Sequence, residues 1–358
     1  MIRFREAFRE AWRNVWSGTT HMVRWCLLLL AVVAAGAWLD TTWVTSLTND
    51  AADYLQHNGS TWVLEAPGQI SGEACDALGS ADSVLAAGAA RAERDGLRTL
   101  ALPRAPIPLY SVTPGFLGVA SATGSGGLVV SDNVAARYGL TAPDTLGLAN
   151  GTVLVGGTYP YPDDGRRSGL GFAALSVTPS QAPFDECWIR IWPPSQNTAM
   201  LTYTAVLPAM GDPMMTAQNV KLSQANPTFA SSFDGYTGFA TRLTRWIPLA
   251  TAAAGFLIGI AATATRRLEY ASDLHAGIPK SFLGVQCLVE ALSWIIPACI
   301  LALVGVVVGA YPAQAETRHI ALLGMRPIVT GGAASLIGAV LAVWTVRESR
   351  LFTLFKNR

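Results

Sequence analysis

The most polar stretch of the C-terminal third runs from Arg266 to Lys280 and begins Arg-Arg-Leu-Glu-Tyr-Ala. Guanidinium, ammonium and carboxylate groups this close together can bind a protein partner through ion pairs and charge-assisted hydrogen bonds. Apolar runs flank the stretch at 246–264 and 283–310, and crossing a bilayer takes about 20 mostly apolar residues. Short basic loops between spans stay in the cytoplasm. The pattern therefore predicts a helical cytoplasmic loop, broken near Pro279, on which a soluble protein could act.

The sequence lacks the motifs of common enzyme chemistries. It contains no Gly-x-x-x-x-Gly-Lys-(Ser/Thr) loop, so ATP binding of the P-loop kind is not expected. It contains no Gly-x-Ser-x-Gly nucleophile elbow, and its four histidines fit no zinc-binding spacing. A net charge of +1 gives no indication of a nucleic-acid partner. We therefore expect a non-catalytic chain that holds no metal and no cofactor of its own.

Two cysteines and one carboxylate stand out beside this loop. Cys75 and Cys187 are the only cysteines of the large polar segment, and outside the cytoplasm they would be free to form a disulfide. Two buried free thiols are the alternative. Glu290 lies within the apolar run 283–310, where a carboxylate is costly unless it is paired or hydrated. We expect it to bind the cytoplasmic loop or a partner helix rather than a substrate.

The charges of the chain predict its topology. Only 14% of the residues are charged. Arginines and lysines gather before the first apolar run, in the loop 266–282 and at the C-terminus, as expected for four spans with both termini in the cytoplasm. We expect transmembrane helices at 24–47, 244–265, 283–310 and 328–347, an external loop at 311–327 and a cytoplasmic tail at 348–358.

Two further features belong to these spans. Asp40, near the outer end of the first span, is expected at the water interface, with a neighbouring helix or a ligand as alternatives. The second and third spans each carry a Gly-x-x-x-Gly pair that permits close helix packing, Gly255 with Gly259 and Gly305 with Gly309.

Residues 1–23 are expected to form an amphipathic helix at the inner membrane surface. Its aromatic residues recur every fourth position, at Phe4, Phe8, Trp12 and Trp16, with charged residues on the other faces. A helix packed on a soluble partner and a cleaved signal peptide are the alternatives.

Residues 48–243 form one large non-membrane block with alternating short strand and helix patterns, which predicts an extracytoplasmic α+β domain. Leu97–Leu102 and Met200–Val206 are among the expected strands. Ser71 and Ser131 are placed to cap short helices. The segment Tyr159–Arg167, dense in aromatic and charged residues, is either a contact site for a partner or substrate, or a solvated hairpin tip with internal charge pairs.

The loop resembles the intracellular loop of the MacB/FtsX-type (type VII) ABC transporter permeases. That family reads Arg-Arg-x-Glu-Ile-(Gly/Ala), followed by Gly and a basic residue. The matching residues here are Arg266, Arg267, Glu269, Ala271, Gly277 and Lys280, whereas Tyr270 replaces the usual Ile. The segments Ser111–Phe116 and Ser131–Leu146 resemble two stretches of the family's external domain, in the same order.

The resemblance implies a permease subunit in the bacterial plasma membrane that transmits the work of a separate ABC ATPase, which binds ATP and Mg²⁺, to its external domain. It implies a second permease copy or paralogue, and contacts to the ATPase through six loop residues, namely Arg266, Arg267, Glu269, Tyr270, Gly277 and Lys280. The cargo would be a peptide, lipid or drug-like molecule. Alternatively, the chain activates an external partner such as an adaptor or cell-wall hydrolase without transport, or it is a receptor or adhesion protein without a motor.

Overall fold

The computed structural model describes residues 4–347 apart from 125, 182, 209–219 and 311–316. The chain divides into a helical unit, Met1–Asn49 with Gly235–Arg358, and a sheet unit, Asp50–Asp234. Among the described residues, four helices are long and apolar enough to cross a membrane, namely Met22–Gln56, Gly235–Ala264, Lys280–Gly309 and Arg318–Trp344.

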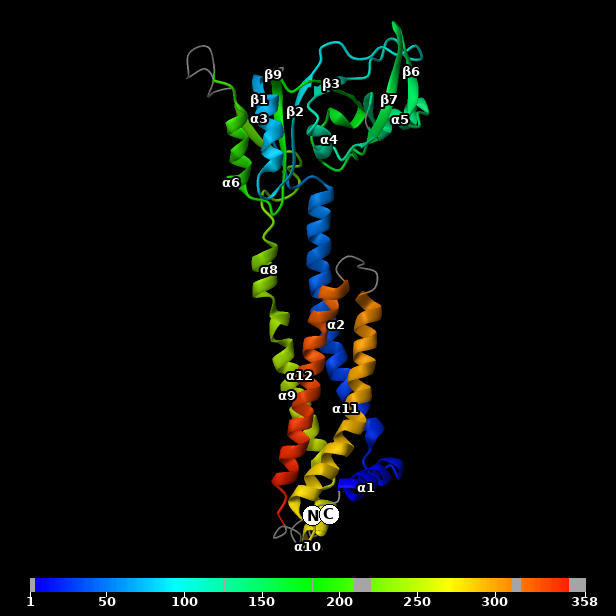
Figure 1. Cartoon of the computed structure of the whole chain (residues 1–358), viewed down its shortest axis with the longest axis vertical. Helices are drawn as coiled ribbons and strands as arrows, with labels where there is room; N and C mark the ends of the chain where they lie inside the picture. Colours follow the sequence, from blue (N-terminus) through cyan, green and yellow to red (C-terminus); the bar gives the residue numbers. More distant parts are fainter. Residues whose placement is uncertain (1–3, 125, 182, 209–219, 311–316, 348–358) are drawn as a thin grey trace. The chain divides into compact units, whose positions relative to one another are not determined.

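The helical unit is a bundle in which α9, α11 and α12 run alongside α2, with α1 and α10 gathered at one end (Figure 1). Its elements are α1 (Phe4–Trp16), α2 (Met22–Gln56), α8 (Gly235–Thr241), η4 (Leu243–Trp246), α9 (Ile247–Ala264), α10 (Arg267–His275), α11 (Lys280–Ala310) and α12 (Thr317–Trp344).

Several helix ends differ from the sequence-based expectation. Helix α2 continues to Gln56, beyond the predicted end of the first span at residue 47. Helix α12 already begins at Thr317, so residues 317–327 are not the external loop that we expected, and helix α11 takes in the last residues of the expected cytoplasmic loop. Hydropathy marks where an apolar environment ends, whereas a helix continues until its backbone is interrupted.

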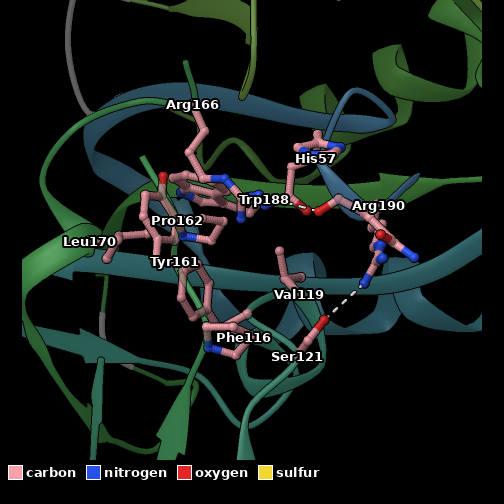
Figure 2. Close-up of a pocket in the computed structure, with 14 residues that line it drawn as sticks. His57, Phe116, Val119, Ser121, Tyr161, Pro162, Arg166, Leu170, Trp188 and Arg190 are labelled. Carbon is pink, nitrogen blue, oxygen red and sulfur yellow. Dashed lines mark hydrogen bonds between the residues drawn. The ribbon is translucent and has the colours of Figure 1, made fainter. Parts of the chain in front are cut away.

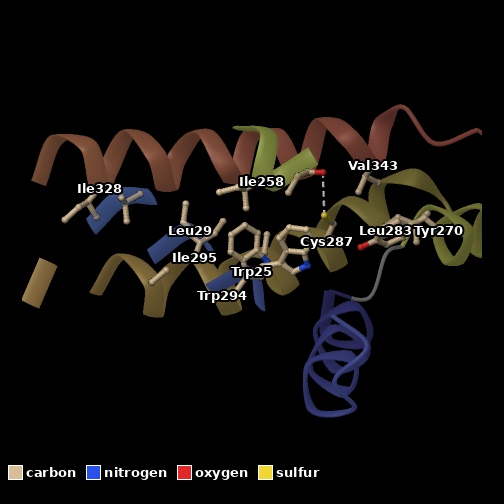
Figure 3. Packing of buried hydrophobic residues seen from close by; sticks show 14 of the residues in the cluster. Trp25, Leu29, Ile258, Tyr270, Leu283, Cys287, Trp294, Ile295, Ile328 and Val343 are labelled. Carbon is tan, nitrogen blue, oxygen red and sulfur yellow. Dashed lines mark hydrogen bonds between the residues drawn. The ribbon is translucent and has the colours of Figure 1, made fainter. Parts of the chain in front are cut away.

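The core of the helical unit joins side chains from all its long helices. Figure 3 shows Trp25 and Leu29 of α2 packed with Trp294 and Ile295 of α11, with Ile328 of α12 in the same cluster. All five side chains are buried. This contiguous packing stabilises the bundle independently of any ligand.

The two Gly-x-x-x-Gly pairs have different surroundings. A methyl group on Gly255 would collide with the backbone of Gly331, and one on Gly259 would collide with the backbone of Ser335, so α9 lies directly against α12. Methyl groups on Gly305 and Gly309 of α11 would meet no neighbouring atom. Among the described residues, the first pair therefore brings two helices together and the second pair does not.

Replacing Gly259 with Leu should lower the thermal unfolding temperature, because the side chain would push α9 away from α12. Overpacking of this kind costs about 1–3 kcal/mol, and more where backbone must move. Scanning fluorimetry in lipid nanodiscs measures the effect. Gly305→Leu is the matched control and should leave the unfolding temperature unchanged. Equal losses in both variants would contradict the close α9–α12 contact.

The described strands of the sheet unit form one mixed sheet in the order β10-β1-β9-β2-β3-β8-β5-β7-β4, with β6 paired to β7. The β3–β8 and β5–β7 pairs are parallel and the other pairs are antiparallel. The strands are β1 (Thr61–Ser71), β2 (Val84–Ala92), β3 (Leu109–Val112), β4 (Thr123–Gly124), β5 (Leu128–Ser131), β6 (Asp144–Leu148), β7 (Gly151–Tyr159), β8 (Ala174–Val177), β9 (Pro183–Ile191) and β10 (Lys221–Gln224).

Short helices connect these strands, as expected for an α+β domain. They are α3 (Gly72–Ala77), η1 (Leu78–Ser80), α4 (Phe116–Val119), α5 (Asp132–Tyr138), η2 (Leu170–Phe172), α6 (Gln196–Ala199) and η3 (Met200–Ala205). The predicted caps are confirmed: the hydroxyl of Ser71 accepts a hydrogen bond from the Ala74 amide, and that of Ser131 accepts one from the Val134 amide.

Two predicted strands are wrong. Met200–Val206 contains the 3₁₀ helix η3, whose turns are stabilised by hydroxyl-to-carbonyl bonds such as Thr202 to Ala199, at 2.7 Å. Leu97–Leu102 makes only isolated bridges, Leu97 with Ile107 and Thr99 with Leu148. In both segments, local hydrogen bonding outweighs the strand preference of the side chains.

The predicted disulfide is confirmed. Cys75 of α3 is bonded to Cys187 of β9, with Cα atoms 5.9 Å apart and a sequence separation of 112. Both residues are fully buried, in a cluster with Leu64, Ile70 and Phe184. The bond fastens a helix that follows β1 to the strand that pairs with β1.

Candidate functional site

The loop between α9 and α11 is built around the short helix α10. Gly277 ends this helix with a φ of +86°, in the left-handed region that suits glycine. The Gly277 amide donates to the carbonyl of Leu274, and the Ile278 amide donates to that of Asp273, at 3.0 and 3.1 Å. These bonds close the C-terminus of α10 in the manner of a Schellman motif. Lys280 then begins α11.

Glu290 of α11 is the centre of the candidate site. It is 5% exposed, and its Oε2 accepts hydrogen bonds from the Arg266 guanidinium and from the Tyr270 hydroxyl, the latter at 3.1 Å. Its Oε1 accepts from Asn14 Nδ2 of α1 at 2.9 Å and from Gln286 Nε2 at 3.2 Å. Four donors surround one carboxylate, which is what a buried charge requires.

Arg266 neutralises the charge of the Glu290 carboxylate and also binds a second carboxylate, that of Glu269. It is itself buried, and its Nε donates to Glu269 Oε2 at 2.7 Å. Its guanidinium carbon lies 5.3 Å from the centre of the Tyr270 ring. Burial raises the pKa of the Tyr270 hydroxyl, which therefore stays protonated and donates to Glu290. Tyrosine, where the resembled family has isoleucine, thus supplies a fourth donor.

The residues predicted for coupling divide into two groups. Arg266, Glu269 and Tyr270 are joined in the Glu290 network. Arg267, Gly277 and Lys280 are exposed, and Lys280 donates a hydrogen bond to the carbonyl of Trp344 at 3.4 Å. The first group holds α10 against the bundle, and the second group faces outward.

Helix α1 packs on the bundle through a face that sequence reasoning missed. Ala7 and Ala11 are completely buried, and Asn14 on the same face reaches Glu290. Phe8, Trp12 and Trp16 are each more than half exposed, and the side chain of Phe4 lies outside the described residues. The spacing of Ala7, Ala11 and Asn14 is a signal that could have identified this face.

Asp40 forms a second buried ion pair in the helical unit. Its carboxylate lies 3.3 Å from the Nε of Arg242, and both side chains are less than 10% exposed. The Arg242 guanidinium also lies 3.9 Å from the centre of the Phe239 ring. The expectation of Asp40 at the water interface is therefore wrong, because an arginine distant in sequence supplies the opposite charge.

The segment Tyr159–Arg167 is packed into the sheet unit. The buried Tyr159 hydroxyl donates to the carbonyl of Leu170 at 2.6 Å, and Arg166 binds Asp164 at 2.5 Å. Arg167 binds Glu65 and Glu186 at 2.9 and 3.2 Å. The predicted internal charge pairs are present, and the segment is anchored by the buried Tyr159 and Tyr161 while Pro160, Pro162, Asp163 and Gly165 are exposed.

The Arg166–Asp164 pair should make stability depend on pH. Its hydrogen bonds to Arg166 lower the pKa of Asp164, so the pair stabilises the fold fully above the ordinary aspartate pKa of about 3.9, and this stabilisation is lost as the pH falls from there through the lowered pKa of Asp164. Asp164→Asn should therefore lower the unfolding temperature at pH 6 and have much less effect near pH 3. Asp163→Asn, at an exposed neighbour, should have little effect at either pH. A pH-independent Asp164→Asn effect would contradict this assignment.

No protein-family model matches the chain, and no curated protein sequence matches it. Among solved structures, it is similar to the periplasmic region of MacB from Actinobacillus actinomycetemcomitans, with 8% identity and a TM-score of 0.34 over 47% of this chain and 90% of that one. It is also similar to the extracellular domain of the noncanonic ABC-type transporter YknZ from Gram-positive bacteria, with 14% identity and a TM-score of 0.29 over 46% of this chain and 99% of that one. Its structural neighbours are thus extracytoplasmic domains of MacB and of an ABC-type transporter, and the likeness covers about half of the chain.

Proposed function

We propose that this chain is the permease subunit of a MacB/FtsX-type ABC transporter in a bacterial plasma membrane, with both termini in the cytoplasm. The observation that carries the proposal is the Glu290 network, which ties the loop helix α10 to α11 and α1 through one buried carboxylate. The loop sequence that resembles this family supplies that network. Four apolar helices, with a mixed-sheet unit inserted after the first, support the same architecture.

In this proposal the exposed part of the loop binds a separate ATPase, and the buried part transmits its motion. Arg267 and Lys280 offer positive charge to the ATPase surface. When the ATPase binds ATP and Mg²⁺ and moves, α10 moves with it. The hydrogen bonds from Arg266 and Tyr270 then transmit this motion to Glu290. The force thereby reaches α11 and α1. The permease pairs with a second copy or a paralogue, and the aromatic residues of α1 lie in the lipid interface.

Export of a peptide, lipid or drug-like cargo is the first candidate outcome of this motion. A second candidate is the activation of an external partner without transport. It is favoured by the buried charges of the helical unit: Asp40 binds Arg242 and Glu290 binds Arg266, so these carboxylates are occupied by partners within the chain. Paired charges hold helices together rather than offering a polar path to a substrate.

Affinity purification in mild detergent, followed by mass spectrometry, tests the proposal. We expect a P-loop ATPase to co-purify with the chain, and to be lost when Arg267 and Lys280 are both replaced by Glu. Arg104→Glu, a charge reversal at an exposed position of the sheet unit, is the matched control and should retain the ATPase. Recovery of the chain alone, under conditions that preserve other ABC complexes, would favour a receptor without a motor. An additional external protein would favour the activation candidate.

Two variants of the loop should uncouple the ATPase without preventing membrane insertion. Glu269→Lys places a second positive charge beside Arg266. Gly277→Pro removes the backbone amide that donates to the carbonyl of Leu274, and proline cannot adopt the positive φ of this position. We expect the ATPase to lose its permease-dependent stimulation, measured as the hydrolysis rate of the complex in nanodiscs relative to the ATPase alone. Wild-type stimulation in both variants would contradict the coupling role.

A further inference from the structure

A cavity of about 320 Å³ lies within the sheet unit, between β9, helix α4 and the segment that follows β7. Figure 2 shows the labelled residues that line it. Its apolar wall includes Phe116, Tyr161 and Trp188, and the rings of Phe116 and Trp188 meet edge to face at 5.7 Å. Small-molecule sites are typically concave, largely apolar and about 300–1,000 Å³ in volume.

Two guanidinium groups, Arg166 and Arg190, line the same cavity. Arg166 forms an ion pair with Asp164. Arg190 instead donates to the carbonyl of Leu55 at 3.2 Å and to the hydroxyl of Ser121 at 3.0 Å, both neutral acceptors; the second bond is dashed in Figure 2. No carboxylate of the described residues forms an ion pair with Arg190, and its buried Nε has no hydrogen-bond partner among them. The positive charge of this arginine is therefore left uncompensated.

The surroundings of Arg190 disfavour its charge. Burial lowers the pKa of its guanidinium, and the nearby positive charge of Arg166 lowers it further. Arginine nevertheless remains protonated in proteins. A bound anion would offset both effects, and it would gain charge-assisted hydrogen bonds in a partly buried site.

We propose that this cavity binds a small amphiphilic organic anion, with its carboxylate or phosphate against Arg190 and its apolar part against Phe116, Tyr161 and Trp188. An aromatic or aliphatic body fits the wall. The proposal does not depend on an ATPase, so its test is independent of the test of the permease function.

A matched set of fluorinated probes tests it, using the full chain in phosphatidylcholine nanodiscs and ¹⁹F NMR titration. The probes are 4-fluorophenylacetate, 4-fluorophenyl phosphate and the neutral 4-fluorophenylacetamide. We expect saturable binding of the anions, with at least one about tenfold tighter than the amide, as expected for hydrogen bonds to a charged group. Tighter binding of the phosphate would identify a phosphate ester as the ligand class, and tighter binding of the acetate would identify a carboxylic acid.

Ser121 provides the matched variants. It is exposed and has a φ of +52°, which Asn and Asp tolerate, so both substitutions should preserve the fold. Ser121→Asp places a carboxylate beside Arg190 and should weaken anion binding about tenfold, whereas Ser121→Asn should change it by less than about twofold. The proposal is overturned if the amide binds as tightly as both anions, if the Asp and Asn variants bind alike, or if no probe saturates. Co-purification of an ATPase should be unaffected in either variant.

Discussion

Replacing Glu290 with Met is expected to destabilise the helical unit by up to about 3–5 kcal/mol, because the substitution leaves the buried Arg266 with only the half-exposed Glu269 as a carboxylate partner. The hydroxyl of Tyr270 and the amide of Asn14 also lose their acceptor. Thermal unfolding in nanodiscs, followed by tryptophan fluorescence, measures the loss. Trp25 and Trp294 are buried in the same cluster and should report it directly.

Two further variants make this result interpretable. Arg266→Met combined with Glu290→Met removes both charges and should recover much of the lost stability, since apolar replacements of a buried pair are often neutral. Glu6→Met removes the carboxylate of a largely exposed pair with Arg9 and should have little effect. If the double variant were as unstable as Glu290→Met alone, an unpaired charge would not be the cause.

Loss of the Cys75–Cys187 disulfide should destabilise the sheet unit by about 2–5 kcal/mol. Cross-linking residues 112 positions apart removes much of the conformational freedom of the unfolded chain. In a domain of this size the double variant Cys75→Ala with Cys187→Ala should unfold about 5–15 °C below the wild type. Differential scanning fluorimetry in nanodiscs measures the shift.

A reducing agent provides the internal control for this prediction. It should lower the unfolding temperature of the wild type toward that of the double variant and leave the double variant unchanged. Cys26→Ser, at a cysteine of the helical unit that the structure leaves unbonded, should respond to the reductant as the wild type does. A reductant effect that persists in the double variant would assign the stabilisation to something other than this bond.

For two buried features, few alternatives existed, so the sequence predicted the disulfide partners and restricted the partner of Glu290 to the cytoplasmic loop or a partner helix. Only two cysteines fall in the polar segment, and they form the disulfide. Only one carboxylate lies inside the apolar run 283–310, next to a loop rich in arginine, and Arg266 binds it. Charge limits the choice of partner strongly, so burial and pairing could be inferred without coordinates.

Neutral polar partners could not be inferred in this way. Asn14 and Gln286 reach Glu290 from α1 and α11, but amides are compatible with both exposed and buried positions. The pairing of Asp40 with Arg242 depends on the packing of segments 202 positions apart, which no local pattern specifies. The strand predictions for Leu97–Leu102 and Met200–Val206 are wrong for a related reason, because tertiary context decides between weak local preferences for secondary structure.

The double attachment at Glu290 has a thermodynamic consequence. One carboxylate binds α10 through Oε2 and α1 through Oε1, so the positions of the two helices are linked. A partner that moves α10 away from Glu290 weakens the binding of α1 to the same carboxylate. By reciprocity, a bilayer that moves α1 away from Glu290 changes the affinity of α10 for that partner by the same factor. A bilayer that binds α1 would thus act as an effector of the loop, and the side-chain amide of Asn14 is the group that couples the two equilibria.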